Sequence, residues 1–150
     1  MAVVEKSMLV SYSAGQMFDL VNGVENYQEF LPWCGGAEIL EQEEQALHAR
    51  LKIDYKGIRQ SFSTRNRTER PVAGKHGSIV MELADGPFRA LDGRWDFKPL
   101  GEGACRIDFR LRYEFSSKLL EKALGSVFNY IANSFVDAFV KRAEALYGPR

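Results

Sequence analysis

The chain contains few of the residues that metal and redox chemistry require. It has two cysteines and two histidines in 150 residues, and the cysteines, Cys34 and Cys105, are far apart and match no metal-binding spacing. The segment Trp33-Cys34-Gly35-Gly36 resembles a redox turn without its second cysteine, so no resolving thiol is present. We therefore predict no metal site and no catalytic residue, and we interpret the cysteines as reduced, buried thiols. Both histidines have polar neighbours and are expected to be exposed.

Long apolar runs and targeting patterns are also missing. No apolar run approaches the roughly 18 residues that a membrane span needs. The first six residues show neither a basic and apolar leader nor a transit pattern, and no phosphate-cradling glycine loop occurs. A length of 150 residues suits one domain with a sizeable core. We expect a single domain over residues 1–150 and a cytoplasmic location.

The zero net charge conceals an uneven distribution along the chain. Residues 1–45 hold eight acidic and one basic side chain, a net charge of −7, whereas residues 46–115 have a net charge of +5 and residues 116–150 of +2. Fields of either sign can select partners. The basic middle of the chain is therefore a candidate interaction surface.

The first third of the chain predicts one strand and two short helices. The opening residues alternate between apolar and polar types, which indicates a strand. Ser13 followed by Gln16 is typical of a helix N-terminus, and the helix should end near Asn22. Residues 24–30 predict a second short helix, which Pro32 stops.

From Gly36 onward the apolar period changes to two. One-sided alternation of this kind is typical of an antiparallel sheet with one solvated face. Glycine-rich turn signals separate the segments. Alternation is clear over 47–56, 58–65, 94–98 and 105–115, and turn signals lie at 56–57, 73–77, 85–87 and 101–103.

The last third predicts one long helix. Ser116 or Ser117 can cap a helix that runs to about Leu146, roughly 45 Å in length. Its apolar arc is broad, so much of its circumference should be covered. The order of strand, two short helices, about six strands and one long helix indicates an α+β layer structure.

A cavity between the helix and the sheet is a hypothesis at this point. A single straight helix does not fill a curved sheet evenly, and Ala123, Gly125 and Ala132 leave space in mid-helix. Mostly apolar concave sites are the usual form of small-molecule pockets. The alternative is that the same residues simply fill a core, and periodicity does not decide between the two. The strand aromatics expected to face the helix are Tyr55, Phe62, Trp95, Phe97, Phe109 and Tyr113.

Three segments resemble a known family. YQEFLPWC at 27–34, DGPFRAL at 85–91 with Trp95-Asp96-Phe97, and AFVKRAEALYG at 138–148 are similar to the coenzyme Q-binding branch of START-like proteins. Members are also called oligoketide cyclase-like or lipid-transport proteins, and one bacterial branch is called the ribosome association toxin. The resemblance implies a helix-grip (START-like, Bet v 1-like) fold. In this fold a curved antiparallel sheet of about six or seven strands grips a long C-terminal helix around a tunnel for a hydrophobic ligand.

The resemblance also implies a function. It indicates non-catalytic binding of ubiquinone or another polyprenyl lipid, without a covalent cofactor, in support of respiratory quinone function. It leaves open a transient contact with the inner membrane surface. Residues 30–33 are expected at the entrance of the tunnel. The candidate ligand-binding residues are Tyr27, Phe30, Leu31, Pro32, Trp33, Tyr55, Phe62, Phe88, Trp95, Phe97, Leu124, Phe128 and Ile131.

Two alternative functions stay open. The first is a factor that binds the large ribosomal subunit and blocks subunit joining, because basic strand positions could contact phosphates. The same face could instead be a solvated surface with acidic cross-strand partners. No aromatic platform interrupts it, which argues against stacking of single strands, and we expect no DNA partner. These positions are Arg50, Lys52, Lys56, Arg59, Arg65, Arg67, Arg94, Lys98, Arg106, Arg110 and Arg112.

The second and weaker alternative is a polyketide cyclase. Such an enzyme must polarise a carbonyl group, for which Tyr55, Tyr113, Arg89 and Asp92 are candidates. On apolar strands, however, tyrosines more often supply packing and one hydrogen bond each.

Overall fold

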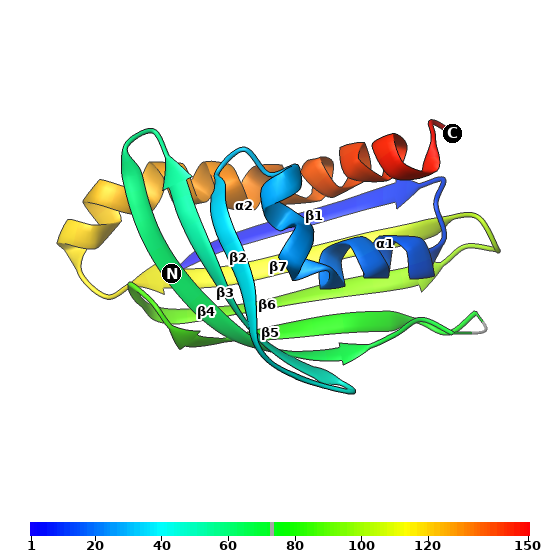
Figure 1. Cartoon of the computed structure of the whole chain (residues 1–150), viewed down its shortest axis with the longest axis horizontal. Helices are drawn as coiled ribbons and strands as arrows, with labels where there is room; N and C mark the ends of the chain where they lie inside the picture. The colour runs from blue at the N-terminus through cyan, green and yellow to red at the C-terminus, as the bar shows by residue number, and fades with distance from the viewer. Residues whose placement is uncertain (73) are drawn as a thin grey trace.

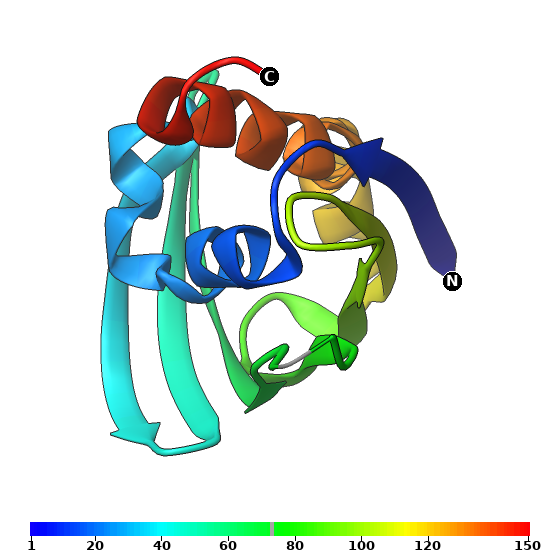
Figure 2. The ribbon, with the colours of Figure 1, turned by 90° about the vertical axis from the view of Figure 1, so that its right-hand side faces the viewer.

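The computed structural model describes residues 1–72 and 74–150. Within these residues one seven-stranded antiparallel sheet has the order β1-β7-β6-β5-β4-β3-β2 and curves around the C-terminal helix (Figures 1 and 2). The turn expected at 73–77 includes residue 73, which lies outside the described residues. The elements are β1 (Ala2–Val10), α1 (Ala14–Asn22), the 3-10 helix η1 (Val24–Glu29), β2 (Cys34–Glu43), β3 (Ala46–Tyr55), β4 (Ile58–Glu69), β5 (Gly77–Asp85), β6 (Phe88–Pro99), β7 (Cys105–Phe115) and α2 (Lys118–Tyr147).

The predicted start of the first helix is confirmed. The backbone N–H of Gln16 donates to Ser13 Oγ at 3.1 Å, and the backbone N–H of Ser13 donates to Gln16 Oε1 at 3.0 Å. This reciprocal pair satisfies two of the backbone donors that a helix N-terminus leaves free. Helix α1 ends at Gly23, and η1 follows directly. Both short helices therefore occupy one end of the curved sheet (Figure 2).

The predicted strands are present. Their bounds agree best with the prediction where apolar and polar residues alternate without interruption. Strand β7 has the predicted bounds because its buried apolar residues alternate with outward residues along its whole length. Strand β6 begins at Phe88, six residues before the predicted alternation. Strand β5 has the consecutive apolar residues Ile79, Val80 and Met81, which hide its period from the sequence. Lys56 and Gly57 both have positive φ, 50° and 81°, as the tight turn between β3 and β4 requires.

Helix α2 lies along the open side of the curved sheet (Figure 2). Its N-cap is Ser117, whose Oγ accepts from the backbone N–H of Leu120 at 3.1 Å. Of the three small residues expected to leave space in mid-helix, only Ala132 is buried and lines a cavity beneath the helix. Ala123 is exposed, and a side chain at Gly125 would meet only Glu121. Ala123 lies on the opposite side of the helix from Ala132, because successive residues turn by about 100°. Gly125 lies on nearly the same side as Ala132, but it is half-buried and does not line the cavity.

The α+β architecture expected from the sequence is confirmed. No helix in the described residues combines the length and apolar character that crossing a membrane would need.

Candidate ligand-binding cavity

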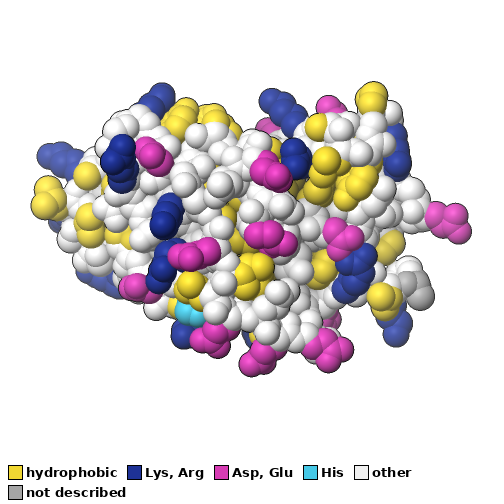
Figure 3. Space-filling view, in the orientation of Figure 1, with side chains coloured by type: hydrophobic (Ala, Val, Ile, Leu, Met, Phe, Trp, Pro, Cys, Tyr) yellow, Lys and Arg dark blue, Asp and Glu magenta, His cyan; other side chains and the backbone are white. Residues whose placement is uncertain are grey.

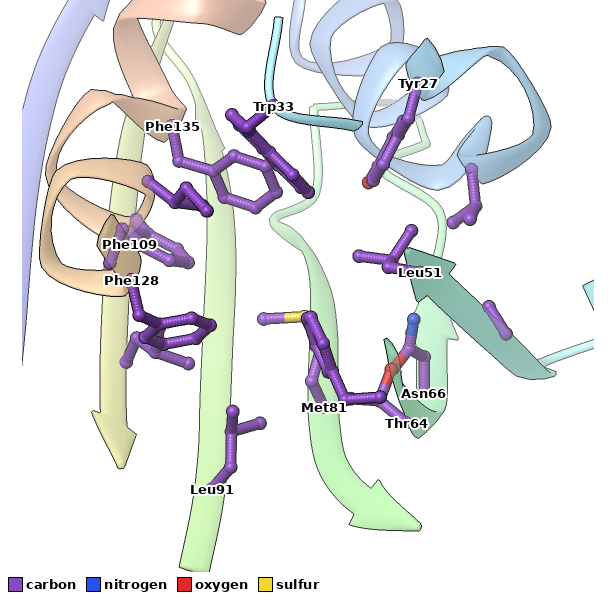
Figure 4. Close-up of a pocket in the computed structure, with 16 residues that line it drawn as sticks. Tyr27, Trp33, Leu51, Thr64, Asn66, Met81, Leu91, Phe109, Phe128 and Phe135 are labelled. Carbon is purple, nitrogen blue, oxygen red and sulfur yellow. The ribbon is translucent and has the colours of Figure 1, made fainter. Parts of the chain in front are cut away.

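An apolar cavity of about 60 Å³ lies between α2 and the concave face of the sheet. Sixteen residues from η1, α2, five of the strands and the connection between η1 and β2 surround it, and Figure 4 shows them. None of them carries a charged side chain. They are Val24, Tyr27, Trp33, Ala49, Leu51, Phe62, Thr64, Asn66, Met81, Leu91, Phe109, Leu111, Phe128, Ile131, Ala132 and Phe135.

Tyr27 and Trp33 form the wall nearest the short helices. The Tyr27 ring packs edge-on against Phe139 at a centroid distance of 5.4 Å, and Trp33 packs on Phe135 at 5.9 Å. The Tyr27 hydroxyl donates to the Val21 carbonyl oxygen. Burial, together with the nearby Cys34 and Glu25, raises the pKa of Tyr27 far above its ordinary value. The phenol is therefore neutral and rigidly placed.

A second, smaller hollow of about 10 Å³ lies toward the N-terminal end of α2. Phe62 and Phe128 contribute to both hollows, and their rings meet edge-to-face at 6.0 Å and 77°. These two rings therefore separate the central cavity from the second hollow. The second hollow is lined by Ile53, Ile58, Gln60, Phe62, Pro87, Phe88, Phe115, Leu124, Val127 and Phe128.

The central cavity is small for a ligand in the present conformation. Small-molecule pockets commonly measure about 300–1,000 Å³, and an engineered cavity of about 150 Å³ admits benzene. A prenylated ring therefore requires side chains to move outward. Met81 is the most adaptable of the lining residues because its side chain is unbranched, and it extends into the middle of the cavity (Figure 4).

The predicted binding residues fall into three groups. Two of them, Phe88 and Leu124, line only the second hollow, beside Phe62 and Phe128. Six do not line either hollow. The five that line the central cavity are Tyr27, Trp33, Phe62, Phe128 and Ile131.

Trp95 and Phe97 do not line the cavity as the sequence suggested. Both are 0% exposed. Phe18 of α1 packs edge-on against Phe97 at 5.8 Å, and Phe139 of α2 packs against Trp95 at 5.5 Å. At this end of the sheet, α1 fills the space under α2, so the two aromatic residues form solid core.

Of residues 30–33, expected at the entrance of the tunnel, only Trp33 lines the cavity. The Phe30 ring packs against Phe139 at 5.4 Å, with the Arg142 guanidinium 5.0 Å from its centroid. Arg142 in turn donates to Glu29 at 3.2 Å. Leu31 is buried in the core and Pro32 points to solvent, so neither lines the cavity.

Tyr55 also lies outside the cavity. Its ring stacks on Tyr130 of α2 at 5.6 Å with an interplanar angle of 4°. Because Tyr130 is 47% exposed, this pair lies at the surface edge of the contact between β3 and α2. Tyr55 therefore closes the sheet against the helix without reaching the interior.

The candidate ligand-binding set left out eleven residues of the cavity wall, although the sequence had placed two of them, Phe109 and Ala132, between helix and sheet. Most are ordinary inward-facing apolar residues, which sequence patterns do not separate from core. Thr64 and Asn66 could have been recognised from the sequence as candidate site residues, because they are polar side chains at inward positions of the alternating strand β4. The missed residues are Val24, Ala49, Leu51, Thr64, Asn66, Met81, Leu91, Phe109, Leu111, Ala132 and Phe135.

The thiols and histidines do not form a reactive cluster in the described part of the chain. Burial raises the pKa of Cys34 and raises that of Cys105 to about 11, so both thiols are neutral near pH 7. The described residues contain no group of three or more His, Cys, Asp and Glu side chains that could hold a metal ion. His76 contacts Asp96 at 2.7 Å. His48, expected to be exposed, is half-buried, because β3 is an internal strand of the sheet, and its Nε2 has no partner.

The four residues considered for a cyclase do not converge. Arg112 donates to both carboxylate oxygens of Asp92, at 3.1 and 2.9 Å, on the outer face of the sheet. Arg89 lies 3.9 Å from Glu114, also at the surface. Neither Tyr55 nor Tyr113 lines the central cavity. These groups therefore do not act together on a ligand in the cavity.

The outer face of the sheet carries the predicted basic residues at exposed or half-buried positions. Most of them have acidic partners, as the solvated-face interpretation requires; for example, Arg106 and Lys98 both contact Asp108 at 3.1 Å. Of these predicted basic residues, four make no ion pair with any described residue: Lys52, Lys56, Arg65 and Arg67. The face seen in Figure 3 likewise shows Lys and Arg side chains interspersed with Asp and Glu. The other ion pairs are Arg50–Glu38, Arg59–Asp54, Arg94–Asp96, Arg110–Glu5 and Arg112–Asp92.

A curved antiparallel sheet that grips a C-terminal helix over an apolar cavity defines the helix-grip class of START-like proteins. The chain belongs to the family described as polyketide cyclase / dehydrase and lipid transport, whose model matches residues 10–140. The family resemblance noted from the sequence is therefore confirmed.

Individual relatives carry two kinds of name. The chain is 47% identical over 148 residues to the ribosome association toxin RatA of Vibrio cholerae, covering 99% of both chains. It is 31% identical to the mitochondrial coenzyme Q-binding protein COQ10 homolog B of Xenopus laevis, over 95% of this chain and 58% of that protein. Among solved structures, the 18 kDa protein CC1736 from Caulobacter crescentus has a TM-score of 0.73 and 29% identity, covering 99% of this chain and 100% of the other.

Proposed function

We propose that this protein binds a neutral hydrophobic small molecule, a polyprenyl quinone such as ubiquinone or a similar lipid, without transforming it. The observation that carries the proposal is the uncharged, largely apolar cavity under α2. The similarity to a coenzyme Q-binding protein supports the choice of ligand class. In this role the protein supports respiratory quinone function from the cytoplasm, with transient contact at the inner membrane surface where such lipids reside.

Burial of the isoprenoid tail supplies the affinity. Each 100 Å² of apolar surface removed from water stabilises the complex by about 2.5 kcal/mol before ordering costs. The tail enters by displacing Phe62 and Phe128, the two rings between the central cavity and the second hollow. Phe128 also packs on Phe88, Tyr113 and Phe115, and each such aromatic contact contributes about 0.5–1.5 kcal/mol beyond area burial. Burial of a long tail must offset the contacts that opening breaks.

The direct experiment is to purify the protein from cells, extract it with organic solvent and analyse the extract by mass spectrometry. We expect a polyprenyl quinone or related lipid in the extract, or saturable binding when quinone is added. Absence of both outcomes would refute the proposal.

The route of entry has its own test. Leu124 lines the second hollow and is 8% exposed, so Leu124→Trp should block the tail and abolish binding while the domain stays folded. Leu119→Trp makes the same chemical change on the same helix at a position that is 77% exposed, and it should bind normally. Unchanged binding by the Leu124→Trp protein would show that the tail enters elsewhere.

A second candidate function is association with the large ribosomal subunit, which would block subunit joining. It is favoured by the 47% identity to a protein named ribosome association toxin, over nearly the full length of both chains. Of the predicted basic residues, the four that make no ion pair with a described residue, Lys52, Lys56, Arg65 and Arg67, are the best able to contact RNA phosphates. The two functions use different faces of the sheet and can coexist.

Cosedimentation with purified large subunits tests this second function. We expect binding that weakens steeply as salt rises, because phosphate contacts release counterions. Arg65→Glu with Arg67→Glu should reduce binding more than Arg110→Glu with Arg112→Glu, since Glu5 and Asp92 already partner the latter pair. Leu124→Trp should have no effect. Binding that is absent, or insensitive to salt and to all four changes, would contradict this function.

A further inference from the structure

Two polar side chains from one strand stand out in the apolar cavity. Thr64 and Asn66 lie two residues apart on the inner face of β4, and they are 8% and 7% exposed. Neither is needed to complete the sheet, because side chains on a strand do not take part in its backbone ladder. An amide placed against apolar side chains carries a desolvation cost unless a partner satisfies it.

The two side chains fix each other's orientation. The Thr64 hydroxyl donates to Asn66 Oδ1 at 2.9 Å. The amide oxygen therefore points along the strand, and the amide nitrogen points toward Leu51 and the open centre of the cavity (Figure 4). Among the described residues Asn66 Nδ2 has no hydrogen-bond acceptor. An N–H donor on a side chain that is 7% exposed is thus presented to whatever occupies the cavity.

The remaining groups around the cavity restrict what that occupant can be. The Tyr27 hydroxyl end also faces the cavity, on the far side of Leu51 from Asn66 (Figure 4), but its proton is committed to the Val21 carbonyl oxygen. No Lys, Arg or His lines the cavity, so a carboxylate or phosphate head would be buried without a counter-charge, at high cost. The cavity therefore suits a neutral hydrogen-bond acceptor.

We propose that Asn66, oriented by Thr64, recognises the ligand's head group, and that this head carries a neutral carbonyl oxygen of the quinone or ketone type. This inference rests on the proposed binding function and adds a specificity residue to it. Thr64 acts as a positioning residue, because it determines which end of the amide faces the ligand. The apolar wall then holds the tail, and Asn66 selects the head.

The test uses two probes that differ only in the carbonyl groups. One is a 1,4-benzoquinone with a tail of two isoprene units. The other is a benzene with the same tail, in which C–H groups replace the two carbonyl groups. Dissociation constants are measured by calorimetry for the wild type and for Asn66→Leu and Thr64→Val. The control is Thr68→Val, a buried residue of β4 that does not line the cavity. Circular dichroism checks that each variant is folded.

We expect Asn66→Leu to weaken quinone binding on the order of fivefold, the worth of one typical hydrogen bond, and to leave binding of the benzene analogue unchanged or stronger. Thr64→Val should give a smaller loss of the same selectivity, and Thr68→Val none. Equal losses for both probes, or no loss for either, would overturn the assignment while leaving cavity binding intact. If the wild-type protein binds neither probe, both the proposed function and this inference are refuted.

Discussion

Filling the cavity from the helix side is the sharpest test of where a ligand binds. Ala132 sits near the middle of α2, is 2% exposed and lines the central cavity. Ala132→Leu adds three carbon atoms, which project into a space of about 60 Å³. The side chain then occupies the volume that a ligand needs.

The effect on stability should be modest. Burial of three extra carbons stabilises the fold by about 2.4 kcal/mol at about 0.8 kcal/mol each, and overpacking typically costs about 1–3 kcal/mol. The two nearly cancel, so the free energy of unfolding should change by less than about 2 kcal/mol, or about 4–8 °C in melting temperature for a chain of this size. Binding, by contrast, should weaken at least about tenfold, which corresponds to about 1.4 kcal/mol.

Two measurements separate these effects. Thermal unfolding by circular dichroism reports stability. Quenching of tryptophan fluorescence by an added short-chain quinone reports binding, because Trp33, one of the two tryptophans, lines the cavity. The matched control is Ala123→Leu, the same change at an exposed position of α2. If Ala132→Leu binds quinone as tightly as the wild type, the ligand is not in this cavity and the reasoning is refuted.

Two further predictions concern the core and the thiols. Phe139 is 0% exposed and packs against Tyr27, Trp95 and Phe135, so Phe139→Ala should lower the free energy of unfolding in urea by about 3–5 kcal/mol. Leu146→Ala, at a position 51% exposed, should change it by less than about 0.5 kcal/mol; similar losses from both would contradict the assigned core. Burial raises the pKa of Cys105 to about 11, above its ordinary value of 9.0, so the folded state holds the thiol proton more tightly than the unfolded state does. That stabilisation is complete below about pH 9 and is lost as pH rises toward 11. Cys105→Ala should make the decline of stability over this range shallower, and an unaltered slope would count against a deeply buried thiol.

The secondary structure was largely predictable from local patterns. Strand β7 alternates so regularly that its bounds were predicted correctly, and the Ser13–Gln16 capping box marked the start of α1. Both signals depend on neighbouring residues in the chain, which is why the sequence alone reveals them. Strand β5 was less distinct because its consecutive apolar residues lack a period of two.

The candidate site was only partly predictable, because a cavity is a property of packing between distant segments. Aromatic residues on the inner face of the sheet have the same sequence pattern whether they line a hollow or fill a core. Phe62 and Phe128 line the cavity, whereas Trp95 and Phe97 are covered by α1 and α2. The basic face shows the same limit, since only the register of the strands reveals that Arg112 lies opposite Asp92 and that Arg65 lies opposite Glu82. Only the side-chain contacts show that Arg112 and Asp92 are hydrogen-bonded.

The order of elements, the inward and outward faces of the strands that alternate regularly and the family resemblance were determined by the amino-acid sequence itself, since each depends on local spacing or on recognisable motifs. The tertiary structure decided where the helix and sheet leave room. It also decided which end of the Asn66 amide faces that room and which cations lack partners. These features arise from contacts between residues far apart in the chain, and close packing in three dimensions determines them.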